Sequence, residues 1–378
     1  MSASDVVELT SALVAIDSIN PSLEPGAAGE GEAATFVADW AKAAGLEVEL
    51  VEATPERPSV VTRARGSGGG RSLLLCGHLD TVGTGAMNAP FEPRIEGDRL
   101  HGRGSYDMKA GVAAALIACR DAASLGLAGD VVVAAVADEE HASVGVQEVL
   151  ATVEADGAIV TEPTEMEIVI AHKGFAWLEV EVRGRAAHGS RPHLGVDAIV
   201  KAGPILTALG ALDARLGSTR HPLLGRGSVH ASLISGGNDL ATYPERCTIG
   251  IERRTLPGEG TAEIERELAG LLAGCREADS VLEASARTLL VREPLETSED
   301  EPVVAALREA AAEVLGSRPP LSGASFWADS AFIAAAGIPT VLFGPSGEGA
   351  HATEEWVSVA DTEACTRVLV EVARAFCG

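Results

Sequence analysis

The sequence is short of positive charge. Its 378 residues contain 29 Lys and Arg against 55 Asp and Glu, which gives a formal net charge of −26. Nucleic acids and anionic membranes are bound through clustered positive potential, which a chain with a sequence pI of about 4.7 lacks. The composition therefore predicts that neither a nucleic acid nor a membrane surface is a partner.

Long apolar runs and paired cysteines are also missing. The most apolar stretch, Gly111 to Cys119, ends at Arg120, whereas a membrane helix needs about 20 apolar residues. The first residues lack the basic and apolar regions of a signal peptide. The six cysteines are scattered without a C-x-x-C pair, which favours reduced thiols. These features predict a cytoplasmic protein.

Hydrophobic residues make up 46% of the chain, which is globular composition, and the length suggests two domains. The first domain, residues 1–172 and 292–378, alternates helical patterns with apolar runs. We expect helices at 6–16, 33–44, 108–123, 302–315 and 361–376, and strands at 72–77, 131–137, 158–161 and 339–343. Continuous apolar strands are typical of a sheet covered on both faces. The pattern predicts an α/β domain with a mixed, mostly parallel sheet sandwiched by helices.

Residues 173–291 follow a different pattern. Apolar and polar residues alternate over 177–183, which indicates a half-exposed strand. We expect helices at 196–216 and 261–276 and further strands at 227–234, 247–254 and 281–291, an order typical of a ferredoxin-like α+β unit. This segment has 14 basic and 14 acidic residues, so the entire negative excess lies in the remainder. The contrast in charge supports an inserted second domain.

Acids and histidines follow the predicted strands of the first domain, where open α/β sheets place their ligands. Two histidines and several carboxylates match the needs of a hydrolytic divalent-metal site. A centre with two ions needs a bridging carboxylate, and Asp107, at the expected start of a helix, is placed to bridge. His78 and Glu162 then complete one ion, and Glu140 and His351 complete the other.

We expect the adjacent acids Glu139 and Glu140 to have separate roles, because neighbouring side chains point in different directions. Glu140 can face a metal ion while Glu139 acts as the general base on the attacking water. Asp80 lies two residues beyond His78. We expect its carboxylate to accept a hydrogen bond from the second imidazole nitrogen, as partners of metal-binding histidines do.

These residues form motifs that resemble one metallohydrolase family, whose members include acetylornithine deacetylase, succinyl-diaminopimelate desuccinylase, aminoacylase and glutamate carboxypeptidase. The motifs are His78–Val82, Gly104–Gly111, Asp138–Glu140, Glu162–Pro163 and Gly349–His351. The resemblance implies that residues 1–172 and 292–378 form a catalytic domain with two Zn²⁺ per subunit, or Co²⁺ or Mn²⁺ in their place. It further implies that residues 173–291 form a lid and dimerisation domain of a homodimer.

The resemblance also assigns roles to individual residues. It implies that Glu139 is the catalytic acid and base, that Asp80 supports the site, and that five residues bind metal: His78, Asp107, Glu140, Glu162 and His351. In the inserted segment, His188 would reach a neighbouring active site and support the oxyanion, and Arg254 would hold a substrate carboxylate.

One position departs from the family pattern. Family members often have Asn where this chain has Ala241, in the stretch Gly236 to Pro244. Either Asn238 or Tyr243 takes over the contact with the substrate, or the substrate differs from those of the well-known deacylases.

The sequence therefore predicts an enzyme that hydrolyses the amide bond of an N-acyl amino acid or related small substrate with water activated by dinuclear zinc. The alternative within the same chemistry is an exopeptidase of the glutamate carboxypeptidase or dipeptidase type. A third alternative, a non-catalytic binding module with this fold, predicts that a metal ligand or Glu139 is lost, and the sequence retains all of them.

Overall fold

A computed structural model describes residues 4–378, and the chain divides into two units. The first unit runs to Ile170 and includes Thr297–Ser322 and Ala328–Gly378. The second unit consists of Ala171–Glu296 and the short segment Gly323–Trp327. The sequence analysis had divided the chain after residues 172 and 291 and had not assigned Gly323–Trp327 to the inserted unit. The roles of the two units as catalytic and lid domains stay predictions.

The first unit is built on a mixed sheet with the strand order β1-β2-β6-β3-β7-β15-β8. The strands are β1 (Glu47–Val51), β2 (Ser59–Ala64), β6 (Val131–Val136), β3 (Leu73–His78), β7 (Gly157–Val160), β15 (Thr340–Leu342) and β8 (Ile168–His172). The three central pairs, β6–β3, β3–β7 and β7–β15, are parallel, whereas β1, β2 and β8 pair antiparallel at the two sides. The predicted α/β class with a mixed sheet is confirmed, and parallel pairing is confined to the centre of the sheet, so it is less extensive than expected.

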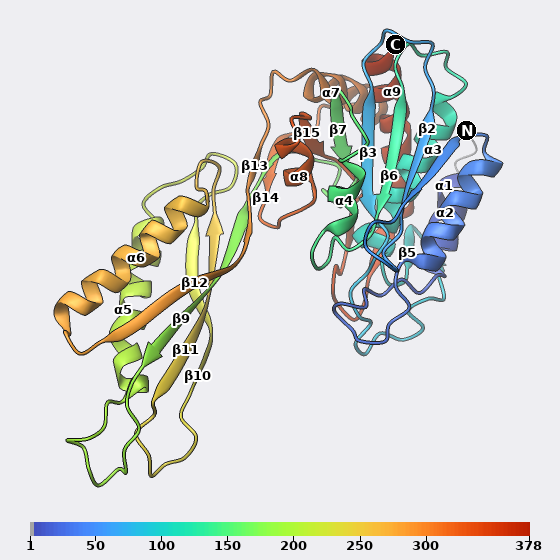
Figure 1. Ribbon diagram of the computed structural model, residues 1–378. Helices are drawn as coiled ribbons and strands as arrows, with labels where there is room; N and C mark the ends of the chain where they lie inside the picture. Colours follow the sequence, from blue (N-terminus) through green and yellow to red (C-terminus); the bar gives the residue numbers. More distant parts are fainter. Residues whose placement is uncertain (1–3) are drawn as a thin grey trace. The chain divides into compact units, whose positions relative to one another are not determined.

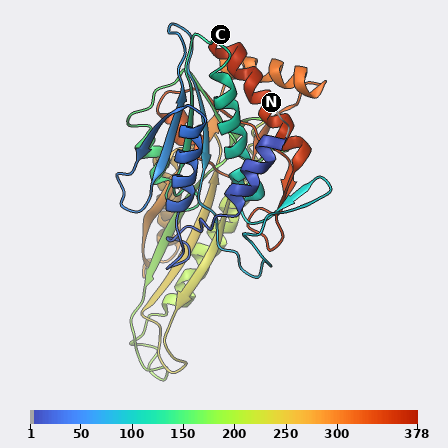
Figure 2. The same cartoon turned by 90° about the vertical axis from the view of Figure 1, so that its right-hand side faces the viewer.

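Helices cover both faces of this sheet. On one face α3 (Ala110–Ala122) packs against α1 (Ser4–Val14) and α9 (Val359–Cys377), and α9 packs against α7 (Pro302–Leu315), as Figures 1 and 2 show. On the other face lie α4 (Val144–Val149) and α8 (Ser330–Ala335), while α2 (Gly31–Ala43) packs on β1 and β2. This double cover buries every residue of β3, β6 and β7, which explains their continuous apolar sequences.

A second, smaller sheet of the first unit has the order β16-β17-β5-β4. Its strands are β16 (Gly347–Glu348), β17 (Trp356–Ser358), β5 (Arg99–His101) and β4 (Arg94–Glu96). The pairing of β17 with β5 brings the chain after His351 beside the chain before Asp107. The helix expected from Met108 begins instead at Ala110, after the short π-type helix η1 (Ser105–Lys109).

The second unit has the element order β9 (Gly174–Arg183), α5 (Ala198–Leu216), β10 (Ser228–Gly236), β11 (Arg246–Thr255), α6 (Thr261–Ala278) and β12 (Glu283–Arg292). Its antiparallel sheet has the order β10-β11-β9-β12, which confirms the ferredoxin-like prediction. Leu178, Val180 and Val182 alternate along β9 and face a core formed with both helices. Two short strands, β13 (Leu295–Glu296) and β14 (Leu321–Ala324), pair with β8.

Two further properties of the described chain bear on the sequence predictions. All six cysteines are buried free thiols. Within residues 4–378, the structure contains no helix with the length and apolar character needed to cross a membrane.

Candidate metal centre

The predicted ligands of the first unit gather at the carboxyl edge of the central parallel strands. His78 is the last residue of β3, Glu140 follows the end of β6, and Glu162 follows the end of β7. Asp107 lies in η1, and His351 lies in the loop between β16 and β17. Parallel strands end at a common edge, so segments far apart in sequence deliver their polar side chains to one place.

Asp107 lies between the two histidines. Its Oδ1 is 3.1 Å from Nε2 of His78, and its Oδ2 is 3.4 Å from Nε2 of His351. Each carboxylate oxygen therefore faces a different imidazole. This is the arrangement that a carboxylate needs in order to bridge two ions about 3.5–4 Å apart.

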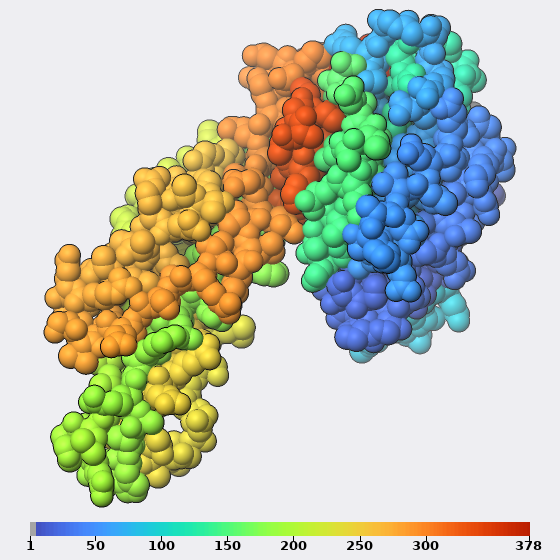
Figure 3. Space-filling view, in the orientation of Figure 1, coloured from blue at the N-terminus to red at the C-terminus, as the bar shows by residue number. Residues whose placement is uncertain are grey.

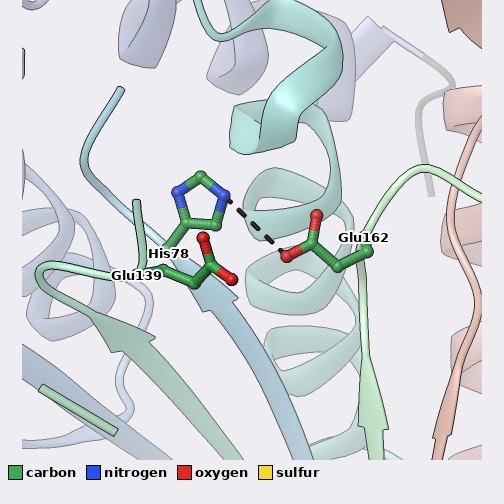
Figure 4. A group of neighbouring side chains, drawn as sticks. All are labelled: His78, Glu139 and Glu162. Carbon is green, nitrogen blue, oxygen red and sulfur yellow. Dashed lines mark ion pairs between the residues drawn. The ribbon is translucent and has the colours of Figure 1, made fainter. Parts of the chain in front are cut away.

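Two overlapping groups of potential ligand atoms share His78. One comprises His78, Glu139 and Glu162, and in each group the potential ligand atoms lie within 4.8 Å of one another. Figure 4 shows the carboxylates of Glu139 and Glu162 beside the imidazole, with Oε1 of Glu162 3.9 Å from Nε2 of His78. The other group comprises His78, Asp107 and Glu140. The structure thus brings Glu139 into the cluster together with the predicted ligands.

The predicted fifth ligand, His351, joins the second group through Glu140. Nε2 of His351 is 3.1 Å from Oε2 of Glu140. The side chain of His351 is 55% exposed, in contrast to that of His78, which is 1% exposed. One side of the cluster is therefore buried, and the side at His351 is open to solvent.

The electrostatics of the cluster fit a cation. Burial raises the pKa of Glu162 to about 8 and raises the pKa of Glu139 well above its usual range. Hydrogen bonds with Asp107 and Glu140 raise the pKa of His351 to about 10. Several buried carboxylates lie close together, and their negative charge needs a positive charge nearby to balance it. Divalent ions held by these imidazole and carboxylate groups would supply that positive charge. The donor set therefore fits divalent metal ions.

Asp80 holds the turn that carries the adjacent acids. The backbone N–H of Glu139 donates to its Oδ1, and the backbone N–H of Glu140 donates to its Oδ2, each at 3.1 Å. The second imidazole nitrogen of His78 contacts the backbone of Asp80 and not its carboxylate, contrary to the prediction. Nδ1 of His78 lies 2.9 Å from the backbone oxygen of Asp80, and the carboxylate is 3.7 Å away because it is directed toward the turn.

Sequence reasoning missed a polar network behind this turn. Asn20 donates through Nδ2 to Asp80 at 2.8 Å and to Asp138 at 3.0 Å. Arg57 donates to Asp138 at 2.7 Å and to Glu30 at 2.6 Å. The side chains of Arg57, Glu30 and Asp138 are at most 8% exposed. Asn20 lies 60 positions from Asp80, and Arg57 lies 81 positions from Asp138, so no local motif indicates the network.

In the second unit, three of the predicted residues lie at one end of the ferredoxin-like fold. The backbone N–H of Gly189 donates to the backbone oxygen of Ala241 at 2.6 Å, and that of Tyr243 donates to the backbone oxygen of Ala187 at 2.9 Å. His188 therefore lies beside the segment that has Ala241 in place of the family Asn. Asn238 and Tyr243 line a surface cavity of about 450 Å³. Figure 3 shows both segments, in green and yellow, on the surface at one end of this unit.

Arg254, the fourth predicted residue, lies at the other end of β11. Arg246 lines the cavity with Asn238 and Tyr243, and Arg254 is eight residues further along the strand, or roughly 25 Å away. Its Nε donates to Glu252 at 2.7 Å, and its guanidinium lies 5.2 Å from the centre of the Phe175 ring. Arg254 therefore lies far along β11 from Asn238 and Tyr243, and the roles of all three as substrate contacts stay predictions.

The fold and the cluster define a metal-dependent hydrolase. Residues 74–375 match the profile of Peptidase family M20/M25/M40, and the chain belongs to this family. It is 32% identical over 351 residues to acetylornithine deacetylase from Myxococcus xanthus, across 89% of this chain and 90% of the relative.

Solved structures share the fold over the whole chain. Aminopeptidase PepT from Bacillus cereus matches with a TM-score of 0.83 and 20% identity over 100% of both chains. The YXEP protein from Bacillus subtilis, described as a dinuclear metal-binding peptidase, matches with a TM-score of 0.75 and 15% identity over 98% of this chain and 97% of that chain. Family, fold and candidate ligands together support metal-dependent hydrolysis of an amide bond.

Proposed function

We propose that this protein is a zinc-dependent amidohydrolase that removes the acyl group from an N-acyl amino acid or a related small substrate. The observation that carries the proposal is the placement of Glu139 in one cluster with His78 and Glu162, next to an Asp107 whose two oxygens face different histidines. This cluster provides a bridging carboxylate and further ligands, with one acid left over for proton transfer.

His78, Asp107 and Glu162 would hold one ion, and Asp107, Glu140 and His351 the other. Bound divalent ions polarise the scissile carbonyl and lower the pKa of a water molecule. Glu139 accepts the proton of the attacking water and donates it to the leaving nitrogen, since it lies within the cluster and is not needed as a ligand. Asp80 keeps Glu139 and Glu140 in place through their backbone N–H groups.

A homodimer is proposed from the surface of the second unit. β10 is an edge strand, and its Leu233 and Ile234 are 74% and 54% exposed. On α5, Ile199 and Val200 are 44% and 68% exposed. An unpaired edge flanked by apolar side chains is suited to pairing with a second copy of the chain.

The separation of His188 from Arg254 supports a role for His188 in the partner subunit. Arg254 lies roughly 25 Å along β11 from Arg246, and His188 lies beside Thr242, beyond the Arg246 end of that strand, so one small substrate does not span both side chains. If both serve catalysis, they serve different active sites. We therefore propose that Arg254 holds the substrate carboxylate, while His188 supports the oxyanion in the site of the partner subunit.

The surroundings of Arg254 favour a substrate with an apolar part. Phe175 lies against Trp177 and Trp327, with ring centres 5.3 and 6.2 Å away. A guanidinium beside aromatic rings provides a carboxylate contact next to an apolar surface. The buried free thiols support the proposed cytoplasmic location, where thiols stay reduced.

The competing function is that of an exopeptidase with the same centre, since the similar structures include peptidases. A panel of N-acetyl and N-formyl amino acids, acyl-glutamates and dipeptides, assayed with zinc, cobalt and manganese, separates the two. The proposed deacylase hydrolyses N-acyl amino acids with the highest kcat/KM. A preference for dipeptides or acyl-glutamates would favour the exopeptidase instead.

A further inference from the structure

A buried glutamate, Glu355, lies directly behind the candidate metal centre and was not identified from the sequence. Its side chain is 0% exposed. Its Oε2 accepts hydrogen bonds from Nη1 of Arg103 at 2.6 Å and from the backbone N–H of Gly104 at 3.0 Å. Its Oε1 accepts from the backbone N–H groups of Tyr106 and Asp107 at 3.0 and 3.1 Å. One carboxylate thus satisfies four donors, three of them from the segment that ends at Asp107.

The backbone around Asp107 needs such an acceptor. Asp107 has φ −115° and ψ 94°, outside helical values, although it lies within η1. The N–H groups of Gly104, Tyr106 and Asp107 lie at the start of η1, where a helix leaves its first N–H groups without intrahelical partners, and they donate to Glu355. Buried N–H groups without an acceptor are costly, so this carboxylate stabilises the non-helical turn that presents Asp107.

The partner of Glu355, Arg103, connects its own segment to the loop of His351 and to the loop after His78. The side chain of Arg103 is 2% exposed, and its Nη2 donates to the backbone oxygens of Ala352 at 2.8 Å and Gly83 at 3.1 Å. Ala352 follows His351, and Gly83 lies in the loop after His78 and Asp80. The ion pair of Arg103 and Glu355 therefore joins three segments, each of which carries a candidate ligand.

We propose that Glu355, together with Arg103, is a positioning residue that fixes the bridging carboxylate of Asp107 relative to His78 and His351. Glu355 touches neither substrate nor metal and acts through the backbone of the ligand-bearing loops. The inference rests on the proposed dinuclear centre. It assigns a role to Arg103 and Glu355 that the ligands alone do not require, because separate loops could otherwise move independently when ions bind.

The experiment compares Glu355→Gln, Glu355→Asp and Arg103→Lys with the unchanged protein. Gln has nearly the same shape but only one acceptor oxygen, and its amide would face N–H donors. We expect Glu355→Gln to weaken the binding of at least one ion about 10- to 100-fold, the usual cost of losing a residue that supports metal ligands. The affinity is measured by titration of Zn²⁺ against a competing chelator, after circular dichroism has shown that the variant is folded.

Two further readouts separate positioning from general stability. In Mn²⁺-loaded protein, EPR spectroscopy reports whether two ions are coupled through a shared ligand, and this coupling should be lost or altered in Glu355→Gln. With saturating metal, kcat should fall more than KM changes, and Glu355→Asp or Arg103→Lys should retain part of the coupling. The matched control is Glu267→Gln in the second unit. Oε2 of Glu267 lies 3.2 Å from Nε of the buried Arg253, and loss of this ion pair should leave metal affinity unchanged.

The outcomes distinguish this inference from the proposed function. If the unchanged protein binds two coupled ions and Glu355→Gln binds them with the same affinity and EPR spectrum, the positioning role is wrong and the metal centre stands. If Glu355→Gln does not fold, Arg103→Lys and Glu355→Asp decide the matter, and unaltered metal binding in both would overturn the inference. If the unchanged protein binds no divalent ion, the proposed function fails first.

Discussion

The two units hold their candidate residues in opposite ways. In the first unit, His78 and Glu162 are 2% and 5% exposed, and the acids around them are hydrogen-bonded to backbone groups and buried partners. In the second unit, His188 and Asn238 are exposed, and the imidazole of His188 has a hydrogen bond with the side chain of Ser190, two residues away. The candidate ligands of the first unit are held within the fold, whereas the predicted contacts of the second unit lie on its surface.

The charge follows the same division. Residues 173–291 are neutral, and the remaining residues have 15 basic and 41 acidic side chains. Only a few of these acids belong to the cluster, and the bound ions would offset them. Under the proposed function, chemistry belongs to the first unit and recognition to the second, and the predictions below test that separation, beginning with the strongest effect.

Removal of metal should abolish activity and loosen the first unit alone. Without cations the carboxyl groups of Glu139, Glu140 and Glu162 lack the ions that would hold them together, so the loops that follow β3, β6 and β7 should open more often. Hydrogen exchange measured after dialysis against a chelator should rise in these loops and stay unchanged in β9 and β11. Added zinc should restore both protection and activity. Equal loss of protection in both units would contradict the separation.

Replacement of the proposed base should reduce the rate without disturbing the metal. Glu139→Gln removes proton transfer, which contributes about 10²- to 10⁴-fold, so kcat should fall by about that factor. Metal content measured by mass spectrometry should stay at the level of the unchanged protein. The control is Glu154→Gln, an exposed acid in the loop before β7, which should change neither quantity. Unchanged kcat in Glu139→Gln would show that another group moves the proton.

Loss of His188 should cost about 10²- to 10³-fold in kcat, the usual effect of removing one oxyanion donor. The test of its action in the partner subunit is to co-express His188→Ala with Glu139→Gln under two affinity tags. A mixed dimer then has one site with both functional residues, so about a quarter of full activity should return on random assembly of a two-fold dimer. Absence of recovery in purified mixed dimers would place His188 in the site of its own chain.

The smallest effect concerns stability in acid and belongs to the second unit. Burial lowers the pKa of His172 to about 4, below its usual value of 6.5. The unfolded chain therefore binds a proton between pH 6.5 and 4 that the folded chain does not, and stability falls as the pH drops through this range, by about 3 kcal/mol in total. His172→Phe, which keeps a ring beside Trp327, should show a smaller fall in urea unfolding.

The control for this prediction is His193→Gln, which changes an exposed histidine of the same unit. Its stability should keep the same dependence on pH as the unchanged protein. An unaltered dependence in His172→Phe would show that other groups determine the acid sensitivity.

Much of the fold could be predicted because its signals are local. The apolar runs of β3, β6 and β7 arise from burial on both faces, and the alternation along β9 arises from burial on one face. The ligand motifs follow directly on those strands. The strand β1 was not predicted, because it is largely exposed and lacks a clear pattern.

The parts of the site that could not be predicted depend on contacts between distant residues. Asp107 was expected at the start of a regular helix, but Glu355, 248 positions away, accepts its backbone N–H and stabilises a non-helical turn. The carboxylate of Asp80 was expected at His78, but it is drawn to the backbone of Glu139 and Glu140. Neither outcome has a signal in the neighbouring sequence, since both arise when loops meet at the edge of the sheet.

The most direct test of the dinuclear centre is a calorimetric titration of the metal-free protein with zinc, in parallel with Asp107→Ala. The account predicts two ions per chain in the unchanged protein and weaker binding of both ions in the variant, because Asp107 faces both histidines. Circular dichroism establishes that the variant is folded. Binding of a single ion by the unchanged protein, or of two ions with equal affinity by both proteins, would contradict it.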